Sequence, residues 1–149
     1  MRTRGCRVFV LAVLVACLGC GAAMAQTVVL SMPGAPGGLR ISNPAVTAVE
    51  IEGALAVEAW FDGAWRARRT EFHARALCGP DDGPRVVRIA PGQVLDVVPW
   101  RGFSCSGQCV MGCRANIYFG AGPFRFVVAM VPSRQRVAGP EFRMPGRPG

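Results

Sequence analysis

Cysteine is the residue type whose number and spacing point most clearly to a chemistry in this chain. Seven cysteines occur, three of them within the first 25 residues. Removal of that segment leaves an even number, as expected for two disulfide bonds in an exported protein. Several pairings are open, and the spacing favours a bond between the first of the four and the later cluster. The four are Cys78, Cys105, Cys109 and Cys113.

A metal site is the alternative for the last three cysteines, which follow a C-x3-C-x3-C spacing. That spacing would align them on one face of a helix, but Gly107 and Gly112 disfavour a helix. The pattern also lacks the C-x2-C pair of zinc knuckles, and thiolates in an oxidising compartment tend to oxidise. We therefore expect disulfides, with no metal and no other cofactor.

No combination of residues matches a hydrolytic active site. His73 is the single histidine, and it alternates with Phe72 and Ala74 as an outward-facing strand residue does. No G-x-S-x-G motif accompanies it. Turns and a solvent-exposed face account for the acidic residues, so we expect no catalytic residues and no enzyme. The acidic residues are Glu50, Glu52, Glu58, Asp62, Glu71, Asp81, Asp82, Asp96 and Glu141.

Tryptophan and arginine side chains are the best candidates for recognition. The dipeptide Asp62–Gly63 stands between two strand-like runs, where it favours a type I′ hairpin turn. A two-residue turn pairs Phe61 with Ala64 and Trp60 with Trp65, and it places both indoles on one face. Such a pair can stack on a sugar ring or anchor a protein interface. Alternatively, the two rings only cap the hairpin.

This register creates a conflict on the opposite face of the hairpin. Val57, Ala59 and Phe61 point there and should enter the core, yet Arg66 and Arg68 share that face. Either the register differs or the hairpin extends beyond the edge of the core. The candidate binding surface consists of Trp60, Trp65, Arg66, Arg68 and Phe103; the cysteine loop 104–112 is a second candidate.

Short strands separated by Pro/Gly turns must position these residues, a pattern typical of an all-β sandwich or barrel. We expect one disulfide-linked, Ig-like antiparallel β-sandwich over residues 26–137. A flexible tail rich in Pro, Gly and Arg should follow over 138–149. The expected strands cover 28–32, 39–43, 46–52, 55–61, 64–69, 71–78, 84–89, 94–100, 114–119, 124–131 and 137–143.

The first 25 residues have the composition of a secretory signal peptide. Arginines precede the apolar run Val8–Leu18, and Ala23-Met24-Ala25 follows as a cleavage site. The apolar run is too short to span a bilayer, which takes about 20 residues. We expect cleavage before Gln26 and an exported, periplasmic or extracellular protein. Alternatively, Leu14–Cys17 resembles a lipobox, which would make Cys17 a lipid anchor.

The charge is positive and dispersed. The chain has 17 basic residues, all of them arginine, against nine acids. Only Arg66, Arg68 and Arg69 come close to a cluster, whereas a nucleic-acid-binding protein concentrates its basic residues on one element. We therefore expect no nucleic-acid partner.

Two stretches carry a family resemblance. The run Ile89-Ala-Pro91-Gly92-Gln93 leads to Trp100-Arg-Gly102, and later comes the strand-like 120–128. With Asn43 after an apolar strand, this order resembles Ig-like sandwich modules of exported bacterial proteins. It is also similar to the bacterial intracellular proteinase-inhibitor domain, although the extra cysteines depart from that pattern. The resemblance covers about residues 41–131 and implies the sandwich fold.

These observations favour a non-enzymatic binding module that recognises an envelope protein or polymer through its surface. The first alternative is a proteinase inhibitor that uses the disulfide-constrained loop between Cys105 and Cys113. The second alternative is an envelope enzyme whose site is not recognisable from the sequence.

Overall fold

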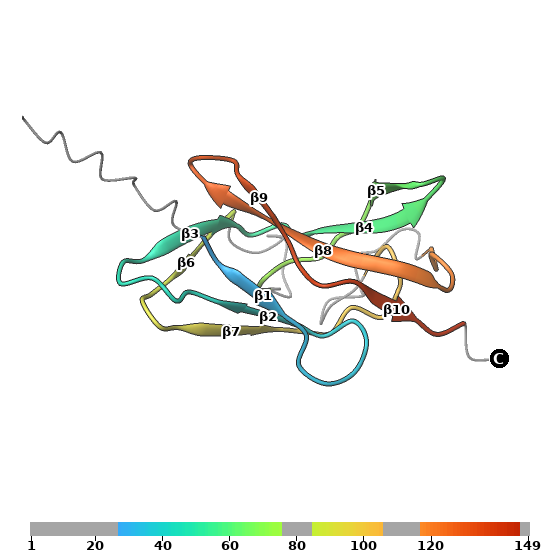
Figure 1. Ribbon diagram of the computed structural model, residues 1–149, viewed down its shortest axis with the longest axis horizontal. Coiled ribbons are helices and arrows are strands. Elements are labelled where there is room, and N and C mark those ends of the chain that lie inside the picture. The colour runs from blue at the N-terminus through green and yellow to red at the C-terminus, as the bar shows by residue number, and fades with distance from the viewer. Residues whose placement is uncertain (1–26, 76–84, 106–116, 147–149) are drawn as a thin grey trace, which may run out of the picture.

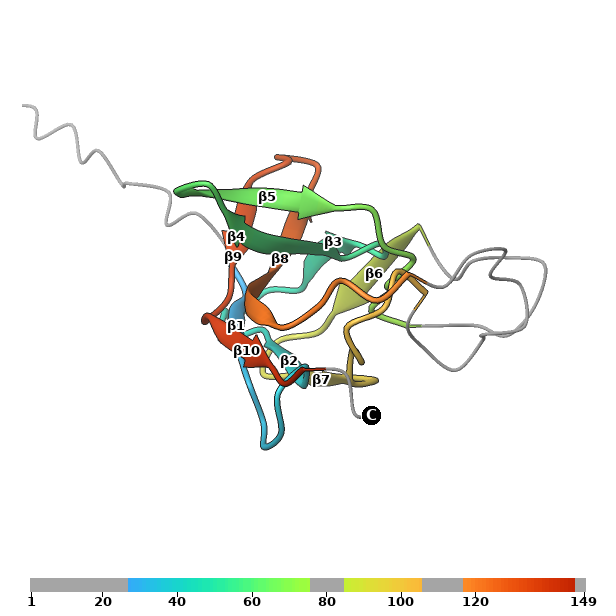
Figure 2. The same ribbon diagram turned by 90° about the vertical axis from the view of Figure 1, so that its right-hand side faces the viewer.

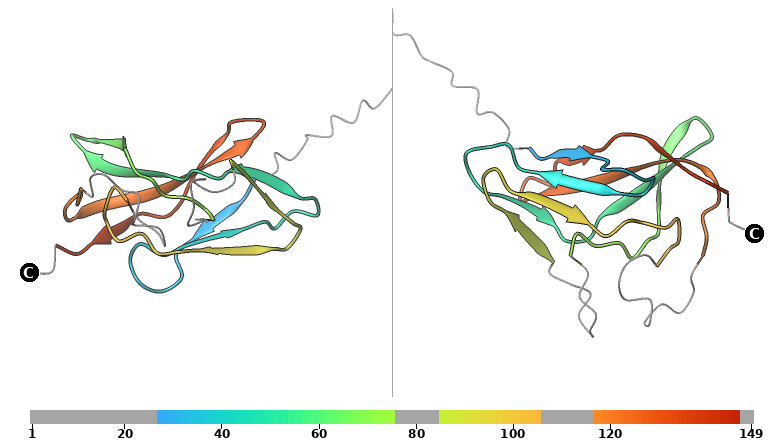
Figure 3. Two further views of the ribbon diagram at one scale, coloured as in Figure 1. Left: turned by 180° about the vertical axis from the view of Figure 1, so that it is seen from behind. Right: turned by 90° about the horizontal axis from the view of Figure 1, so that it is seen from below.

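Two antiparallel sheets make up the part of the chain that the computed structural model describes, residues 27–75, 85–105 and 117–146. No helix occurs in these residues. The small sheet has the strand order β1-β2-β7 and lies below the long strand β8 of the seven-stranded sheet (Figures 1 and 3). The described chain is therefore all-β and consistent with a β-sandwich, as predicted. The strands are β1 (Val29–Ser31), β2 (Leu39–Ser42), β3 (Val49–Glu52), β4 (Ala56–Phe61), β5 (Ala64–Arg68), β6 (Val86–Ile89), β7 (Val94–Val97), β8 (Gly122–Val131), β9 (Arg136–Ala138) and β10 (Phe142–Met144).

Strand β8 is the centre of the large sheet because it pairs with four other strands. It pairs with β3 and β4, and also with β9 and β10. Successive side chains of a strand point to opposite faces. Phe124, Phe126, Val128 and Met130 accordingly enter the core, while Arg125 and its alternate neighbours face outward.

The small sheet alternates in the same way. Leu39, Ile41 and Val97 are buried against the large sheet. Arg40 lies opposite Asp96 on the outer face, and its guanidinium donates hydrogen bonds of 2.6 and 3.1 Å to the carboxylate. This hydrogen bonding lowers the pKa of Asp96 and raises the pKa of Arg40.

Trp100 is the largest side chain in the core, only 1% exposed. Its indole N–H donates to the carbonyl of Phe103 at 2.8 Å, and its backbone N–H donates to Gly37 at 2.9 Å. A Cβ at Gly37 would lie 2.1 Å from the carbonyl oxygen of Trp100, so only glycine fits there. Trp100 is thus a core residue. Its ring neighbours are Phe119, Phe124, Phe126 and Phe142.

Asn43 holds two turns together where the chain passes between the sheets. It is 1% exposed, and its side-chain oxygen accepts from the backbone N–H of Ala45 at 3.0 Å. Its own backbone exchanges hydrogen bonds with Gly92 and Gln93, in the β6–β7 turn. The β2–β3 and β6–β7 connections are therefore joined through one side chain. The side-chain amide donates to the carbonyls of Thr47 (2.8 Å), Ile89 (3.0 Å) and Ala90 (3.1 Å).

Two expected strands are represented in the described residues by isolated pairings alone. Within 71–75 the backbone forms only single bridges, from Glu71 to Cys105 and from His73 to Ala54. Of the expected strand 114–119, the described residues contribute one bridge, between Tyr118 and Phe103. Apolar alternation was present in both segments, but within their described residues neither pairs with a neighbouring strand over several residues.

The C-terminal residues differ from the flexible tail expected from residue 138. Residues 136–138 and 142–144 form β9 and β10, and both pair with β8. Phe142 is 6% exposed and stacks on Phe126, with ring centroids 4.7 Å apart. Pairing with β8 and the buried ring of Phe142 hold this segment in place, although its composition is that of a loop.

Candidate binding surface on the outer face of the large sheet

The β4–β5 hairpin presents two tryptophans on the outer face of the large sheet. Asp62 and Gly63 both have positive φ, 49° and 73°, as a type I′ turn requires. Trp60 pairs with Trp65, and their ring centroids lie 5.4 Å apart in an edge-to-face arrangement. The predicted register is confirmed. Trp60 remains 46% exposed, and Trp65 is half-buried.

The conflict over the arginines is resolved because the hairpin extends beyond the core. β5 contains no buried residue, and Phe61 is 53% exposed although it shares a face with core residues of β4. Arg66 is exposed. The guanidinium of Arg68 lies 6.0 Å from the ring centroids of both Phe61 and Phe119. Its Nε is buried and has no hydrogen-bond partner among the described residues.

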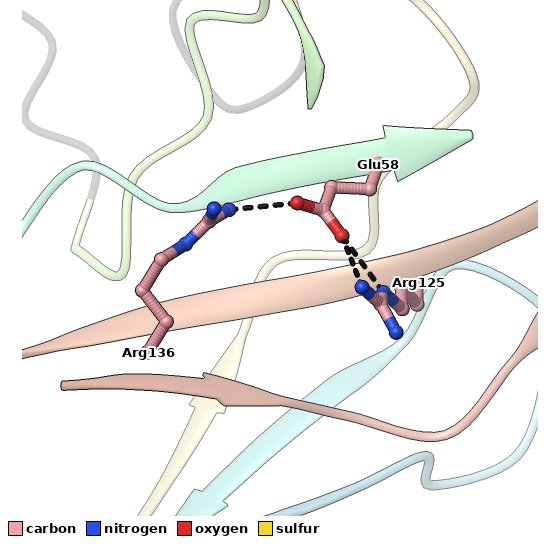
Figure 4. A network of polar contacts seen from close by, with 3 residues as sticks. All are labelled: Glu58, Arg125 and Arg136. Carbon is pink, nitrogen blue, oxygen red and sulfur yellow. Dashed lines mark hydrogen bonds and ion pairs between the residues drawn. The ribbon is translucent and has the colours of Figure 1, made fainter. Parts of the chain in front are cut away.

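On the same face as the tryptophans, a buried carboxylate of β4 accepts hydrogen bonds from arginines of β8 and β9 (Figure 4). Glu58 of β4 is 5% exposed and lies opposite Arg125 of β8. Arg125 donates to one carboxylate oxygen at 2.7 and 2.8 Å, and Arg136 of β9 donates to the other at 2.7 Å. Burial of a carboxylate is costly unless charged partners compensate it, and here two guanidinium groups do so.

Arg125 connects this ion network to the aromatic pair. Its guanidinium lies 4.5 Å from the ring centroid of Trp65, within the range of a cation–π contact. Trp65 is therefore held between Arg125 and Trp60. We call these five residues the Trp–Arg cluster: Glu58, Trp60, Trp65, Arg125 and Arg136.

A shallow depression of about 280 Å³ adjoins the cluster on the same sheet. Small apolar side chains, including Val127, which is 4% exposed, line it together with charged side chains. The lining residues are Glu52, Ala54, Ala56, Val127, Ala129, Arg134 and Arg136.

The carboxylate of the cluster is engaged in contacts within the protein. Both carboxylate oxygens of Glu58 accept charge-assisted hydrogen bonds from arginine, and the residue is only 5% exposed. The side chains that reach the surface are tryptophan and arginine, the types enriched among energetically dominant interface residues.

The structure brings together only part of the predicted surface. Trp60 and Trp65 share the outer face, whereas Arg66 and Arg68 belong to the opposite face of β5. Phe103 packs on Tyr118 instead, with ring centroids 5.1 Å apart, and in the described residues it makes no ring contact with either tryptophan.

The remaining predicted residues fall into two groups. His73 is half-buried between the buried Phe72 and Ala74, as its alternation indicated. Cys105 is 8% exposed, beside Glu71. Cys78, Cys109, Cys113, most of the 104–112 loop and the segment 1–25 with Cys17 lie outside the described residues.

Three residues of the cluster were not singled out from the sequence. Glu58 was assigned to a solvent-exposed face, and this is wrong because Arg125 and Arg136 cover it. Outward alternation of Glu58 and Arg125 was visible in the sequence, but their strands are far apart in the chain. The signal in the sequence was a charged residue between two apolar neighbours in each strand: Glu58 in one and Arg125 in the other.

Comparisons with known proteins identify no relative. No family model, curated protein or solved structure matches the chain. The described residues contain no group of three or more potential metal ligands. They also contain no helix that is long and apolar enough to cross a membrane.

Proposed function

We propose that this chain is an exported, non-enzymatic binding module that recognises an envelope protein through the Trp–Arg cluster. The exposure of Trp60, on a hairpin beyond the core, carries the proposal. A large apolar ring held in water has a cost that a partner would relieve. Arg125 and Trp65 hold the neighbouring surface in one arrangement, which lowers the ordering cost of association.

The ring geometry favours a protein partner over a sugar polymer. A sugar ring stacks on a free, flat aromatic face. Trp65 has Arg125 over its ring, and Trp60 meets it at an interplanar angle of 66°, so the two indoles form no continuous platform. One exposed indole beside arginine is instead the composition of a protein interface.

We infer that the module is Ig-like and belongs to the family that the sequence resembles. In support, Asn43 and the Pro91–Gly92 turn, both part of that resemblance, contact each other through hydrogen bonds.

Export with disulfide formation is the second part of the proposal. Cys105 is buried beside Glu71. In the sequence, Glu71 precedes Cys78 by seven residues. We expect mass spectrometry of the mature protein to find an N-terminus at Gln26 and four cysteines that resist alkylation until reductant is added. A protein from its native compartment with four reactive thiols would contradict this part, and an acylated Cys17 would replace secretion by anchoring.

Replacement of Trp60 with alanine tests the binding surface. We expect Trp60→Ala to weaken binding of the envelope partner by at least about tenfold, because a central anchoring tryptophan contributes about 2 kcal/mol or more. The measurement is surface plasmon resonance with the partner that the wild-type chain captures from an envelope extract.

Phe61→Ala provides the matched control for this experiment. Phe61 is a similarly exposed aromatic residue on the same hairpin, but it points to the opposite face, away from the Trp–Arg cluster. Phe61→Ala should therefore weaken binding less than Trp60→Ala does. Equal losses in both variants, or no loss in Trp60→Ala, would reject the surface. Thermal unfolding of each variant shows whether its fold is retained.

A further inference from the structure

Strand β5 is an edge of the large sheet, and no other described strand lies beyond it (Figure 2). In a hairpin with a two-residue turn, the residues next to the turn exchange backbone hydrogen bonds, and hydrogen-bonded pairs then alternate with non-bonded pairs. Ala64, Arg66 and Arg68 therefore point their backbone groups at β4. Trp65 and Ala67 point theirs away from the sheet, and the described residues provide no backbone partner for them.

The two faces of this edge differ in chemistry. Trp65 and Ala67 lie on the outer face with the Trp–Arg cluster, while Arg66 and Arg68 lie on the other. No ion pair involves Arg66 or Arg68 within the described residues, and the Nε of Arg68 has no acceptor. An added strand would thus meet apolar side chains on one face and unneutralised arginines on the other.

We propose that β5 binds an extended acidic segment of the partner, which adds a strand to the large sheet. The segment alternates apolar and acidic residues, since its side chains also alternate between the two faces. Its backbone pairs with Trp65 and Ala67, and its carboxylates pair with Arg66 and Arg68. This inference rests on the proposed function, because it specifies how the partner of the Trp–Arg cluster docks.

A second copy of the chain fits this edge poorly. Antiparallel pairing of two β5 edges would bring the arginines of one copy beside those of the other, and like charges across strands are destabilising. Charged residues on an edge strand are a common means of preventing such self-pairing. The same arginines attract a strand of opposite charge.

The probe is a short capped peptide that alternates valine and glutamate, with a valine–lysine peptide as its charge control. We expect the glutamate peptide to bind and to slow amide hydrogen exchange at Trp65 and Ala67, measured by NMR. Ala67→Pro should weaken its binding by about tenfold, because it removes an outward N–H but no β4–β5 hydrogen bond. Ala67→Thr keeps that N–H, so the glutamate peptide should bind it more tightly than it binds Ala67→Pro.

Arg66→Glu is a second variant at an exposed position, where loss of the fold is not expected. It should lose the glutamate peptide and gain the lysine peptide. The inference is overturned if the lysine peptide binds wild type equally well, or if exchange slows elsewhere than at Trp65 and Ala67. It is also overturned if sedimentation shows that the chain forms a dimer through β5. Binding of a DNA duplex that Ala67→Pro does not weaken would likewise overturn it.

The two proposals fail in distinguishable ways. If Trp60→Ala abolishes capture of the partner but Ala67→Pro leaves partner and peptide binding unchanged, only the strand-addition proposal fails. If the peptide binds β5 as described but Trp60→Ala changes no partner interaction, the proposed function fails.

Discussion

Replacement of Trp100 with alanine should lower the free energy of unfolding by about 3–5 kcal/mol, the range found when a fully buried aromatic residue is removed from a core. Trp100 is 1% exposed and is surrounded by the rings of Phe119, Phe124, Phe126 and Phe142. The variant also leaves the carbonyl of Phe103 without its indole donor. Denaturant unfolding followed by circular dichroism measures the loss.

The matched control is Trp60→Ala, the same chemical change at an indole that is 46% exposed. It removes the edge-to-face contact with Trp65 and should cost only about 1 kcal/mol. Equal losses for the two variants would contradict the assignment of Trp100 to the core and Trp60 to the surface.

Replacement of Asn43 with alanine should have the second largest effect. Its side-chain amide donates to Thr47, Ile89 and Ala90, and its oxygen accepts from Ala45. Each buried polar group left without a partner costs about 1–3 kcal/mol, so we expect a total loss of about 2–4 kcal/mol after relaxation. The neighbouring Ser42→Ala, measured in the same unfolding experiment, should change stability by less than about 1 kcal/mol.

Asn43→Asp distinguishes loss of a donor from loss of volume. At neutral pH a carboxylate would face three carbonyl oxygens, so the folded state raises the pKa of the introduced carboxyl above its unfolded value. The folded state then binds more protons, and stability rises as pH falls through that pKa. A pH-independent loss equal to that of Asn43→Ala would show that the amide donors do not hold the two turns together.

The β4–β5 hairpin shows how much of the fold local chemistry encodes. The turn at Asp62–Gly63 requires positive φ, and this requirement fixes the register that pairs Trp60 with Trp65. Apolar alternation likewise identified most strands, including the segment 124–131, which forms most of β8. By contrast, the expected strand 137–143 is divided into β9 and β10, and the position of β10 depends on Phe142 fitting beside Phe126.

The binding surface was only partly predictable for a related reason. Trp60 and Trp65 are neighbours across one turn, so their contact follows from local sequence. Phe103 has no such constraint, and it packs on Tyr118 instead. The Glu58–Arg125–Arg136 network joins residues separated by 67 and 78 positions, and no pattern within one strand specifies such pairs.

By itself the sequence determined the all-β class, the type I′ hairpin and the pairing of its two indoles, because each depends on the residue types of one turn or one strand. Only the tertiary structure decided that Glu58 is buried, that Arg125 lies over Trp65 and that β4 is the one described strand beside β5. These features arise where strands distant in the chain become neighbours, and that adjacency is set by packing of the whole core.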